Sequence, residues 1–301
     1  MADPLRARIV WLFVAMLAIG LAGGVAFDPT PARPENHRAG YRVLEADFHV
    51  HTTLSDGSLT PLGIARQAER RGLDVIALTE HNSALPGGVA RAWAHARGGP
   101  LVLRGEEVTS SRFHLIAVGI DETVSPNQPL SDVIADIHRQ RGIAIAAHPV
   151  KRYWNEYEPV LGQLDGSEVM HPLAYSDAFA GWRWEDLRSF YEKTPGLMAI
   201  GSSDYHWGSH LGLCRTYVFV QEPVSEESVM EALRARRTVV IDRTGRHYGA
   251  PDLVTAMERE PIAARAIDYR YAGEGTGDRI ARVIGLLGLL GLVLVGRSRP
   301  A

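Results

Sequence analysis

The sequence predicts an α/β fold with a mostly parallel sheet that closes, or nearly closes, into a barrel. Over residues 45–241, short apolar runs alternate with helix-length amphipathic segments, as in proteins built from repeated strand–helix units. About seven such repeats suit a closed or distorted barrel. The chain has 301 residues, of which 46% are hydrophobic, and this is sufficient for one large core.

The individual elements follow from this alternation. We expect strands at the short apolar runs, which are residues 75–78, 101–108, 115–120, 143–147, 197–200 and 217–220. We expect helices at residues 61–71, 89–96, 130–140, 184–192 and 225–236. The first helix has a clear start signal, because the Thr60 hydroxyl can cap it and Pro61 suits its first turn.

Both ends of the chain carry apolar runs that we interpret as membrane segments. Residues 9–27 contain 19 uncharged positions after Arg6 and Arg8, close to the ~20 residues that cross a bilayer. The same pattern describes a cleavable signal peptide, so an anchor and a signal both stay open. Residues 283–296 form a second, shorter run that two arginines follow. The positive-inside rule then places both chain ends in the cytoplasm.

These features predict five segments and a location. The segments are an N-terminal anchor or signal (1–28), a proline-rich linker (29–40), a folded domain (41–250), a second linker (251–279) and a C-terminal membrane segment (280–297). With both ends inside, the folded domain would be anchored to the membrane and would lie in the periplasm or otherwise outside the cytoplasm.

Composition excludes some functions. The formal net charge is −3, whereas proteins that bind nucleic-acid backbones usually carry a strong basic excess, so we expect no nucleic-acid partner. Cys214 is the single cysteine. An intrachain disulfide and a thiolate zinc site are therefore impossible.

The densest group of polar residues lies in residues 47–57. His49 and His51 are two apart, so on a strand both imidazoles point to the same side. Neutral imidazole is a common metal ligand, and Asp47 and Asp56 place acids nearby. Asp56 followed by Gly57 by itself also describes a simple turn.

Further acids and histidines recur at the ends of apolar runs. They are Glu80 and His81, Glu106 and Glu107, His148, and Asp204 with His206; His114 opens another run. In barrel enzymes the catalytic residues come from the C-terminal ends of strands. Packing does not explain why several strands deliver such residues at the same end, so we predict a metal site there.

These motifs resemble those of the PHP (polymerase and histidinol phosphatase) metallophosphoesterases. The matching motifs are His49-x-His51 with Ser55-Asp56-Gly57, Thr79-Glu80-His81-Asn82, Gly105-x-Glu107, His114-Leu115, Ala147-His148-Pro149 and Ser203-Asp204-x-His206. The resemblance covers roughly residues 45–241 and is greatest to the stand-alone phosphoesterase or carbaryl-hydrolase-like members. It implies a distorted (β/α)7 barrel that holds up to three divalent metals.

The resemblance also implies the roles of individual residues. The implied metal ligands are His49, His51, Asp56, His81, Glu107, His114, His148, Asp204 and His206. Of these, His49, His51, Glu107, Asp204 and His206 would be the catalytic residues.

Four nearby residues depart from the family pattern or compete with it. Many members have Asp where this chain has Glu80, next to a ligand, so we expect altered support of that ligand and no loss of metal. Glu106 competes with Glu107 for the bridging role, and the motif spacing favours Glu107. Glu168 and His171 are expected to be supporting or surface residues.

The ligand set predicts the cofactor and the reaction. Nine ligands exceed the needs of one tetrahedral zinc and suit two or three divalent ions, and the imidazoles favour Zn, Mn or Fe over Mg. Such ions lower the pKa of bound water toward ~7, which would make metal-bound hydroxide available to attack a phosphate ester. Lys151 and Arg152 follow the His148 motif and would bind the phosphate oxygens, unless they are only solvated surface charges.

We therefore predict a metal-dependent phosphoric ester hydrolase that acts on a small molecule. The first alternative is a carboxyl ester or carbamate hydrolase that uses the same site. The second is a membrane-tethered binding or scaffold domain with a vestigial site. The sequence does not predict the oligomeric state.

Overall fold

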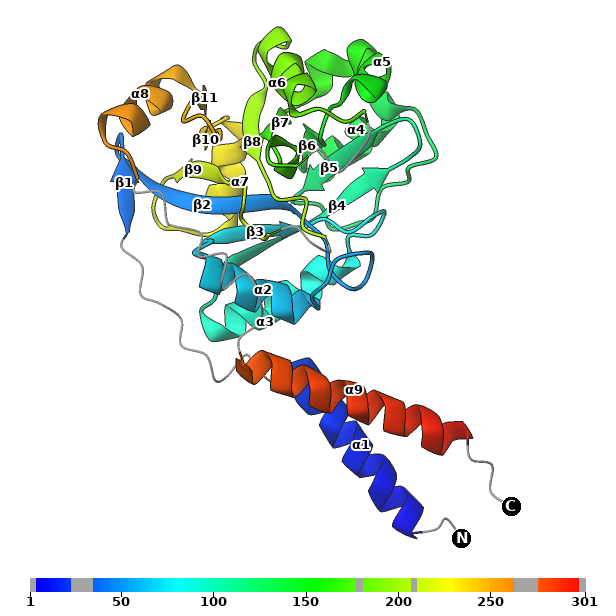
Figure 1. Cartoon of the computed structure of the whole chain (residues 1–301). Helices are drawn as coiled ribbons and strands as arrows, with labels where there is room; N and C mark the ends of the chain where they lie inside the picture. Colours follow the sequence, from blue (N-terminus) through cyan, green and yellow to red (C-terminus); the bar gives the residue numbers. More distant parts are fainter. Residues whose placement is uncertain (1–3, 23–34, 177–180, 207–209, 263–275, 298–301) are drawn as a thin grey trace. The chain divides into compact units, whose positions relative to one another are not determined.

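The computed structural model describes residues 4–22, 35–176, 181–206, 210–262 and 276–297. The chain divides into two compact units, one formed by residues 1–31 with 268–301 and the other by residues 32–267. The larger unit, shown with its labelled elements in Figure 1, carries all the predicted site residues.

The strands of the larger unit run in one sheet. They are β1 (Asn36–Arg38), β2 (Tyr41–Val50), β3 (Val75–Leu78), β4 (Leu101–Thr109), β5 (His114–Val118), β6 (Ile143–Ala146), β7 (Gly166–Met170), β8 (Met198–Gly201), β9 (Thr216–Val220), β10 (Thr238–Ile241) and β11 (His247–Gly249). Their order is β11-β10-β9-β2-β3-β4-β5-β6-β7-β8, and β1 pairs with β2.

The sheet is mixed, which corrects the prediction of a mostly parallel one. Strands β2, β3 and β4 are parallel, and so are β6, β7 and β8. Between these two groups, β5 is antiparallel to both of its neighbours. Only residues 110–113 join β4 to β5, and so short a connection forms a hairpin and cannot hold a crossover helix.

Side-chain hydrogen bonds nearly close the barrel, because they join β8, at one edge of the sheet, to β9 and β10 near the other edge. The Thr238 hydroxyl on β10 donates to the carbonyl of Ala199 on β8 at 2.9 Å. The Thr216 hydroxyl on β9 donates to the Gly201 carbonyl and accepts from the Gly201 N–H, each at 2.9 Å. Gly201 permits this approach, because an added Cβ would lie 2.6 Å from the carbonyl oxygen of Arg215.

Helices lie at the five predicted segments, and two further helices, at Trp154–Tyr157 and Pro251–Arg259, were not predicted. The second lies in the predicted linker 251–279, where Leu253 and Met257 pack in one cluster with Phe219. They are α2 (Pro61–Arg71), α3 (Leu85–Arg97), α4 (Leu130–Arg139), α5 (Trp154–Tyr157), α6 (Trp184–Lys193), α7 (Glu226–Arg234) and α8 (Pro251–Arg259), with 3-10 turns at Lys151–Tyr153, Glu158–Gln163 and Pro172–Ala174. The start of α2 is as predicted, since the Thr60 hydroxyl accepts from the Gly63 N–H at 3.1 Å. Gly72 ends this helix in the left-handed conformation.

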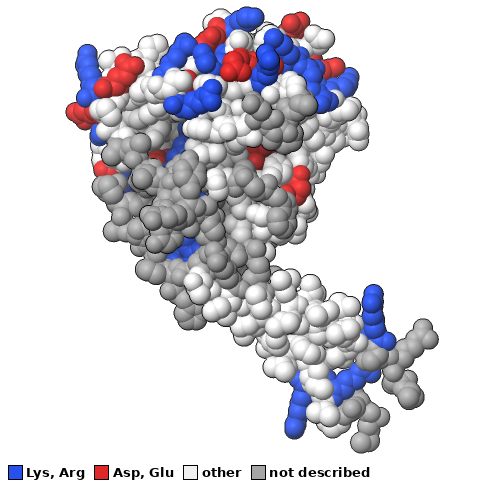
Figure 2. All heavy atoms as spheres, viewed as in Figure 1, with Lys and Arg blue, Asp and Glu red and all other residues white. Residues whose placement is uncertain are grey.

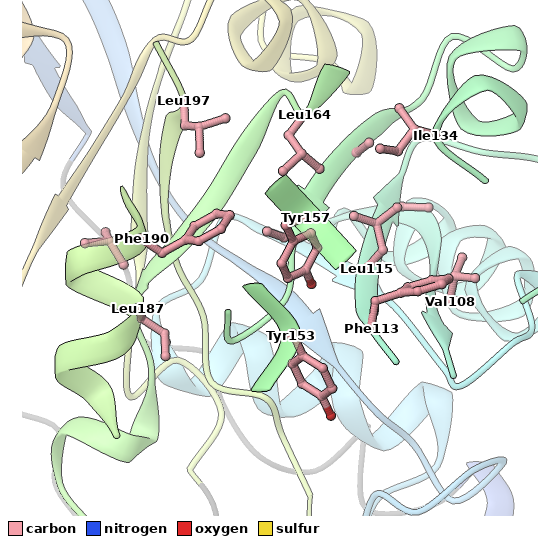
Figure 3. Packing of buried hydrophobic residues seen from close by; sticks show 14 of the residues in the cluster. Val108, Phe113, Leu115, Ile134, Tyr153, Tyr157, Leu164, Leu187, Phe190 and Leu197 are labelled. Carbon is pink, nitrogen blue, oxygen red and sulfur yellow. The ribbon is translucent and has the colours of Figure 1, made fainter. Parts of the chain in front are cut away.

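Apolar residues fill the barrel and also the space between the sheet and its helices. Phe48, Ile145 and Val218 lie in the interior cluster. The largest outer cluster packs Tyr157 and Phe113 with Phe190 of α6, as Figure 3 shows. Tyr153 lies at the edge of the labelled residues in that view, with its hydroxyl pointing away from them. The core thus supports the strand ends from both sides.

The smaller unit is a pair of helices, α1 (Pro4–Ala22) and α9 (Thr276–Arg297). They run antiparallel, because Gly20 meets Gly285 while Arg6 donates to the Val295 carbonyl at 3.0 Å. A Cβ on Gly285 would lie 2.6 Å from the Cα of Gly20, so this close approach requires glycine. In Figure 2 the visible described surface of the pair is largely uncharged, with blue basic side chains at the end where α1 begins and α9 ends.

The structure does not support the two predicted membrane segments. Among the described residues, no helix combines the length and the apolar character that a membrane crossing requires. Helix α1 begins at Pro4, so Arg6 and Arg8 lie within it, and its described uncharged part is residues 9–22. The uncharged part of α9 is residues 283–296.

Candidate metal centre

The end of β2 places two imidazoles side by side. His49 and His51 flank the buried Val50, so both imidazoles point to the same side of the chain. Their ring centroids are 5.0 Å apart. Neither side chain is exposed to solvent.

Glu107 on β4 lies at the middle of the histidines. The Nδ1 atoms of His81 and His114 are each 2.8 Å from its carboxylate, and Nε2 of His148 is 3.1 Å away. Nε2 of His49 and Nε2 of His51 follow at 3.5 and 3.6 Å. Burial opposes ionisation, but His49 and the hydrogen bonds from His114 and His148 hold the pKa of Glu107 well below its usual range.

Asp204, after β8, is the second acid of the centre and exposes 17% of its side chain. Its Oδ1 lies 3.1 Å from Nε2 of His49 and 3.4 Å from Nε2 of His51. Its backbone φ is 43°, an uncommon conformation for a residue other than glycine. Although burial raises the pKa of Asp204, His49 and the hydrogen bond from His171 bring it well below the ordinary value. Both acids are therefore anionic beside the imidazoles.

The outer side of the centre is formed by Asp56, His81 and His206. Nε2 of His206 is 3.1 Å from one Asp56 oxygen, and Nε2 of His81 is 3.3 Å from the other. Asp56 exposes 51% of its side chain and the two histidines expose 29% each. This side is therefore the open one.

The nine predicted ligands thus gather in one place. Three overlapping groups offer ligand atoms that lie within 4.8 Å of one another: His51 with Asp56, His81 and His206; His49 with His51 and Asp204; and His49 with Glu107 and His148. His114 joins them through its contact with Glu107. All five residues predicted to be catalytic are in these groups.

The donor atoms fit divalent metal ions. Nε2 of His49, Nε2 of His51 and Oε2 of Glu107 are buried and have no hydrogen-bond partner in the part of the chain that the structure describes. Leaving such atoms unsatisfied costs free energy, which a bound cation would recover. Imidazole nitrogens with carboxylate oxygens are the ligand types that Zn, Mn and Fe accept.

Glu80 supports the loop that carries Asp56. Its Oε2 accepts from the Thr52 N–H at 3.0 Å and from the Ser55 hydroxyl. Ser55 in turn lies 3.4 Å from Nδ1 of His51. Glu80 therefore reaches a ligand only through its neighbours, as its position in the sequence predicts.

Glu106 and Glu107 point to opposite sides of β4. The Glu106 carboxylate accepts from the Val124 N–H at 2.6 Å and lies in none of the ligand groups. Burial raises the pKa of Glu106 to about 7. Glu107, and not Glu106, thus faces the histidines.

Asp47 is a supporting residue to which the sequence did not assign a role. It is fully buried, and its two oxygens accept from the N–H groups of Ser203 and Gly212 at 3.0 and 2.9 Å. Burial raises the pKa of Asp47 to about 6. Asp47 therefore ties β2 to the segment that carries Asp204. Its place two residues before His49 is the available signal in the sequence.

Lys151 and Arg152, the predicted phosphate-binding residues, lie on a 3-10 turn and differ in their surroundings. Nζ of Lys151 is 3.7 Å from Asp186 of α6. The Arg152 guanidinium lies 4.9 Å from the Tyr153 ring centroid, and Tyr153 stacks on His114 at 5.2 Å. Arg152 is thus the one of the two that neighbours an aromatic residue in contact with the centre.

Known proteins resemble the chain in structure and in sequence. A two-domain protein from Bacteroides vulgatus that contains a predicted PHP-like metal-dependent phosphoesterase has a TM-score of 0.58 at 24% identity, over 76% of this chain and 74% of that one. This likeness establishes the fold. No family model matches the chain.

Three curated relatives match in sequence. An uncharacterised protein of Methanocaldococcus jannaschii is 29% identical over 148 residues, which cover 42% of this chain and 82% of the relative. A 3',5'-nucleoside bisphosphate phosphatase of Chromobacterium violaceum is 40% identical over 84 residues, covering 26% of this chain and 29% of the enzyme. A phosphoribosyl 1,2-cyclic phosphate 1,2-diphosphodiesterase of Eggerthella lenta is 35% identical over 82 residues, covering 25% and 31%.

The chain therefore spans under a third of the length of the two relatives that are named as enzymes. The likeness to the Bacteroides vulgatus protein agrees with the nearly closed barrel. The ordered motifs thus resemble those of PHP-like metal-dependent phosphoesterases, and the solved structure that shares the fold contains a predicted domain of this kind.

Proposed function

We propose that the protein hydrolyses a small phosphate ester at a centre of two or three divalent metal ions. The observation that carries this proposal is the set of three overlapping ligand groups around Glu107 and Asp204. Adjacent metals that share ligands suit in-line displacement at phosphorus. The names of two relatives, a phosphatase and a phosphodiesterase, support the same chemistry.

We assign the roles of the ligand residues from their burial. When bound, the ions lower the pKa of water and neutralise charge on the phosphoryl oxygens. The fully buried His49 and His51 anchor the inner side. The half-exposed Asp56, His81 and His206 form the open side, which we propose as the approach for the phosphate group. Arg152 would bind its oxygens.

Six imidazoles among nine ligands support Zn, Mn or Fe as the resident metal. Reconstitution of the metal-free full chain with each ion in turn tests this choice. The assay compares an aryl phosphate monoester, an aryl phosphate diester, an aryl acetate and an aryl carbamate. We expect metal-dependent hydrolysis of at least one of the two phosphate esters and slower turnover of the acetate and the carbamate.

The double change His49→Ala and His51→Ala should abolish both metal retention and hydrolysis, while Glu106→Gln, a buried acid outside the ligand groups, should retain both. Equal phosphate hydrolysis after the double change would refute the proposal. Metal-dependent turnover of the acetate or carbamate alone would establish the carboxyl ester alternative. A folded chain that binds no metal and hydrolyses nothing would favour a vestigial site.

A further inference from the structure

We propose that Glu168 and His171 are positioning residues that determine which atoms of His49 and Asp204 face the metals. The inference rests on the metal centre of the proposed function and is independent of the substrate. Both residues come from β7 or the position just after it. Neither belongs to the ligand groups described above.

Both side chains are buried at the same end of the barrel. Glu168 is completely buried and His171 nearly so, and such groups are rarely buried without partners. Residues three apart on a regular strand face opposite sides. The pairing of β7 with β8 shifts register between Glu168 and Met170, and this irregularity lets both side chains turn toward the centre.

Glu168 determines the tautomer of His49. Its Oε1 lies 3.1 Å from Nδ1 of His49 and also accepts from the Ser202 hydroxyl. A carboxylate only accepts, so Nδ1 carries the proton and Nε2 of the neutral ring keeps its lone pair. That Nε2 atom is the one that lies 3.1 Å from Asp204 and 3.5 Å from Glu107.

Glu168 also holds the backbone of a second ligand. Its Oε2 accepts from the N–H of His148. The φ of His148 is 26°, an unfavourable value for a residue with a side chain, which the surrounding structure must maintain. One buried carboxylate therefore supports two ligands that are contributed by two different strands.

His171 orients Asp204 in the same way. Its Nδ1 accepts from the Leu173 N–H at 3.2 Å, so the proton of the neutral ring is on Nε2. Nε2 then donates to Oδ2 of Asp204 at 3.1 Å. This leaves Oδ1 directed at His49 and His51. Hydrogen bonds of this kind to metal ligands are typically worth 10–100-fold in metal affinity.

The first test is Glu168→Gln in the full chain, with Glu106→Gln as the matched control. Glutamine has one acceptor oxygen, so it cannot accept from both His49 and His148. Metal affinity is measured by competition with a chelator for Mn, Zn and Co, together with the visible spectrum of the cobalt protein and the melting temperature of the metal-free chain. We expect roughly 10–100-fold weaker binding and an altered cobalt spectrum for Glu168→Gln only.

The second test uses two substitutions of His171. Asn can still accept from the Leu173 N–H but cannot reach Asp204, whereas the longer Gln amide can donate to it. His171→Asn should weaken metal binding, and His171→Gln should restore at least part of it, with equal melting temperatures without metal. This pair keeps the inference testable if Glu168→Gln does not fold.

Two outcomes would overturn the inference: Glu168→Gln binding metal as tightly as Glu106→Gln, or His171→Asn binding it as tightly as the unaltered chain. The expected affinity losses in a chain that hydrolyses no phosphate ester would refute the proposed function and support the positioning roles. Phosphate ester hydrolysis by the unaltered chain, with unchanged metal affinities in the Glu168 and His171 variants, would support the proposed function and refute the positioning roles.

Discussion

Replacement of Glu107 by glutamine tests how the metal centre is organised. The carboxylate lies within 2.8–3.1 Å of nitrogen atoms of His81, His114 and His148. Glutamine keeps one acceptor oxygen, replaces the other with a donor and removes the negative charge. The altered side chain therefore cannot serve all three histidines, and it cannot offer two oxygens to two cations.

The size of the effect follows from the lost interactions. A hydrogen bond to a charged group contributes about 1.5–3 kcal/mol, and the change removes the charge from the acceptor of the bonds that His114 and His148 make to Oε1. We expect the free energy of metal binding to weaken by about 2–4 kcal/mol, which is roughly 30- to 700-fold at ~1.4 kcal/mol per tenfold. Hydrolysis at subsaturating metal should fall by a similar factor.

The measurement is a chelator competition on the unaltered chain, Glu107→Gln and Glu106→Gln at one pH, with initial rates on an aryl phosphate. Glu106→Gln should stay within about threefold of the unaltered chain, because Glu106 accepts from the Val124 N–H on the other side of β4. If Glu107→Gln binds metal within threefold of the unaltered chain, the placement of Glu107 at the centre is wrong.

Three further predictions follow from the same geometry. Burial raises the folded-state pKa of Glu106 from 4.5 to about 7, so the stability that the protonated Glu106 contributes is complete below pH 4.5 and is lost as the pH rises through 7. The melting temperature of the unaltered chain should therefore fall relative to that of Glu106→Gln between pH 5 and 8. Parallel melting curves against pH would contradict this. Chelation of bound metal should lower stability by about 2.7 kcal/mol at a metal concentration 100-fold above Kd, measured by thermal melting; an unchanged melting temperature would show that folding and binding are not linked. Arg152→Ala should raise KM for an aryl phosphate several-fold more than Lys151→Ala, because Arg152 lies over Tyr153 while Lys151 is directed at Asp186. Steady-state kinetics measure both KM values. Equal increases would show that Arg152 has no special role in substrate binding.

Local patterns predicted many elements of this fold. The helix at Pro61–Arg71 and the strand at Val75–Leu78 have the predicted bounds, because capping residues and apolar runs act over a few neighbouring positions. The direction of β5 was missed, although the short connection over residues 110–113 was a usable signal. The terminal runs were interpreted as membrane segments, and no helix among the described residues has the length and apolar character that this interpretation requires.

The ligand residues could be named from their order along the chain, but the contacts among them could not. The alternation of side chains along a strand predicts that Glu106 and Glu107 face opposite sides. Only the packed barrel shows on which side the histidines lie. Glu168 lies 119 positions from His49, and the side that His171 faces depends on a register shift in β7 that no local pattern encodes. Residue chemistry is a local property that can be read along the chain, whereas tautomer, orientation and burial arise from distant strand ends that meet only when the barrel closes.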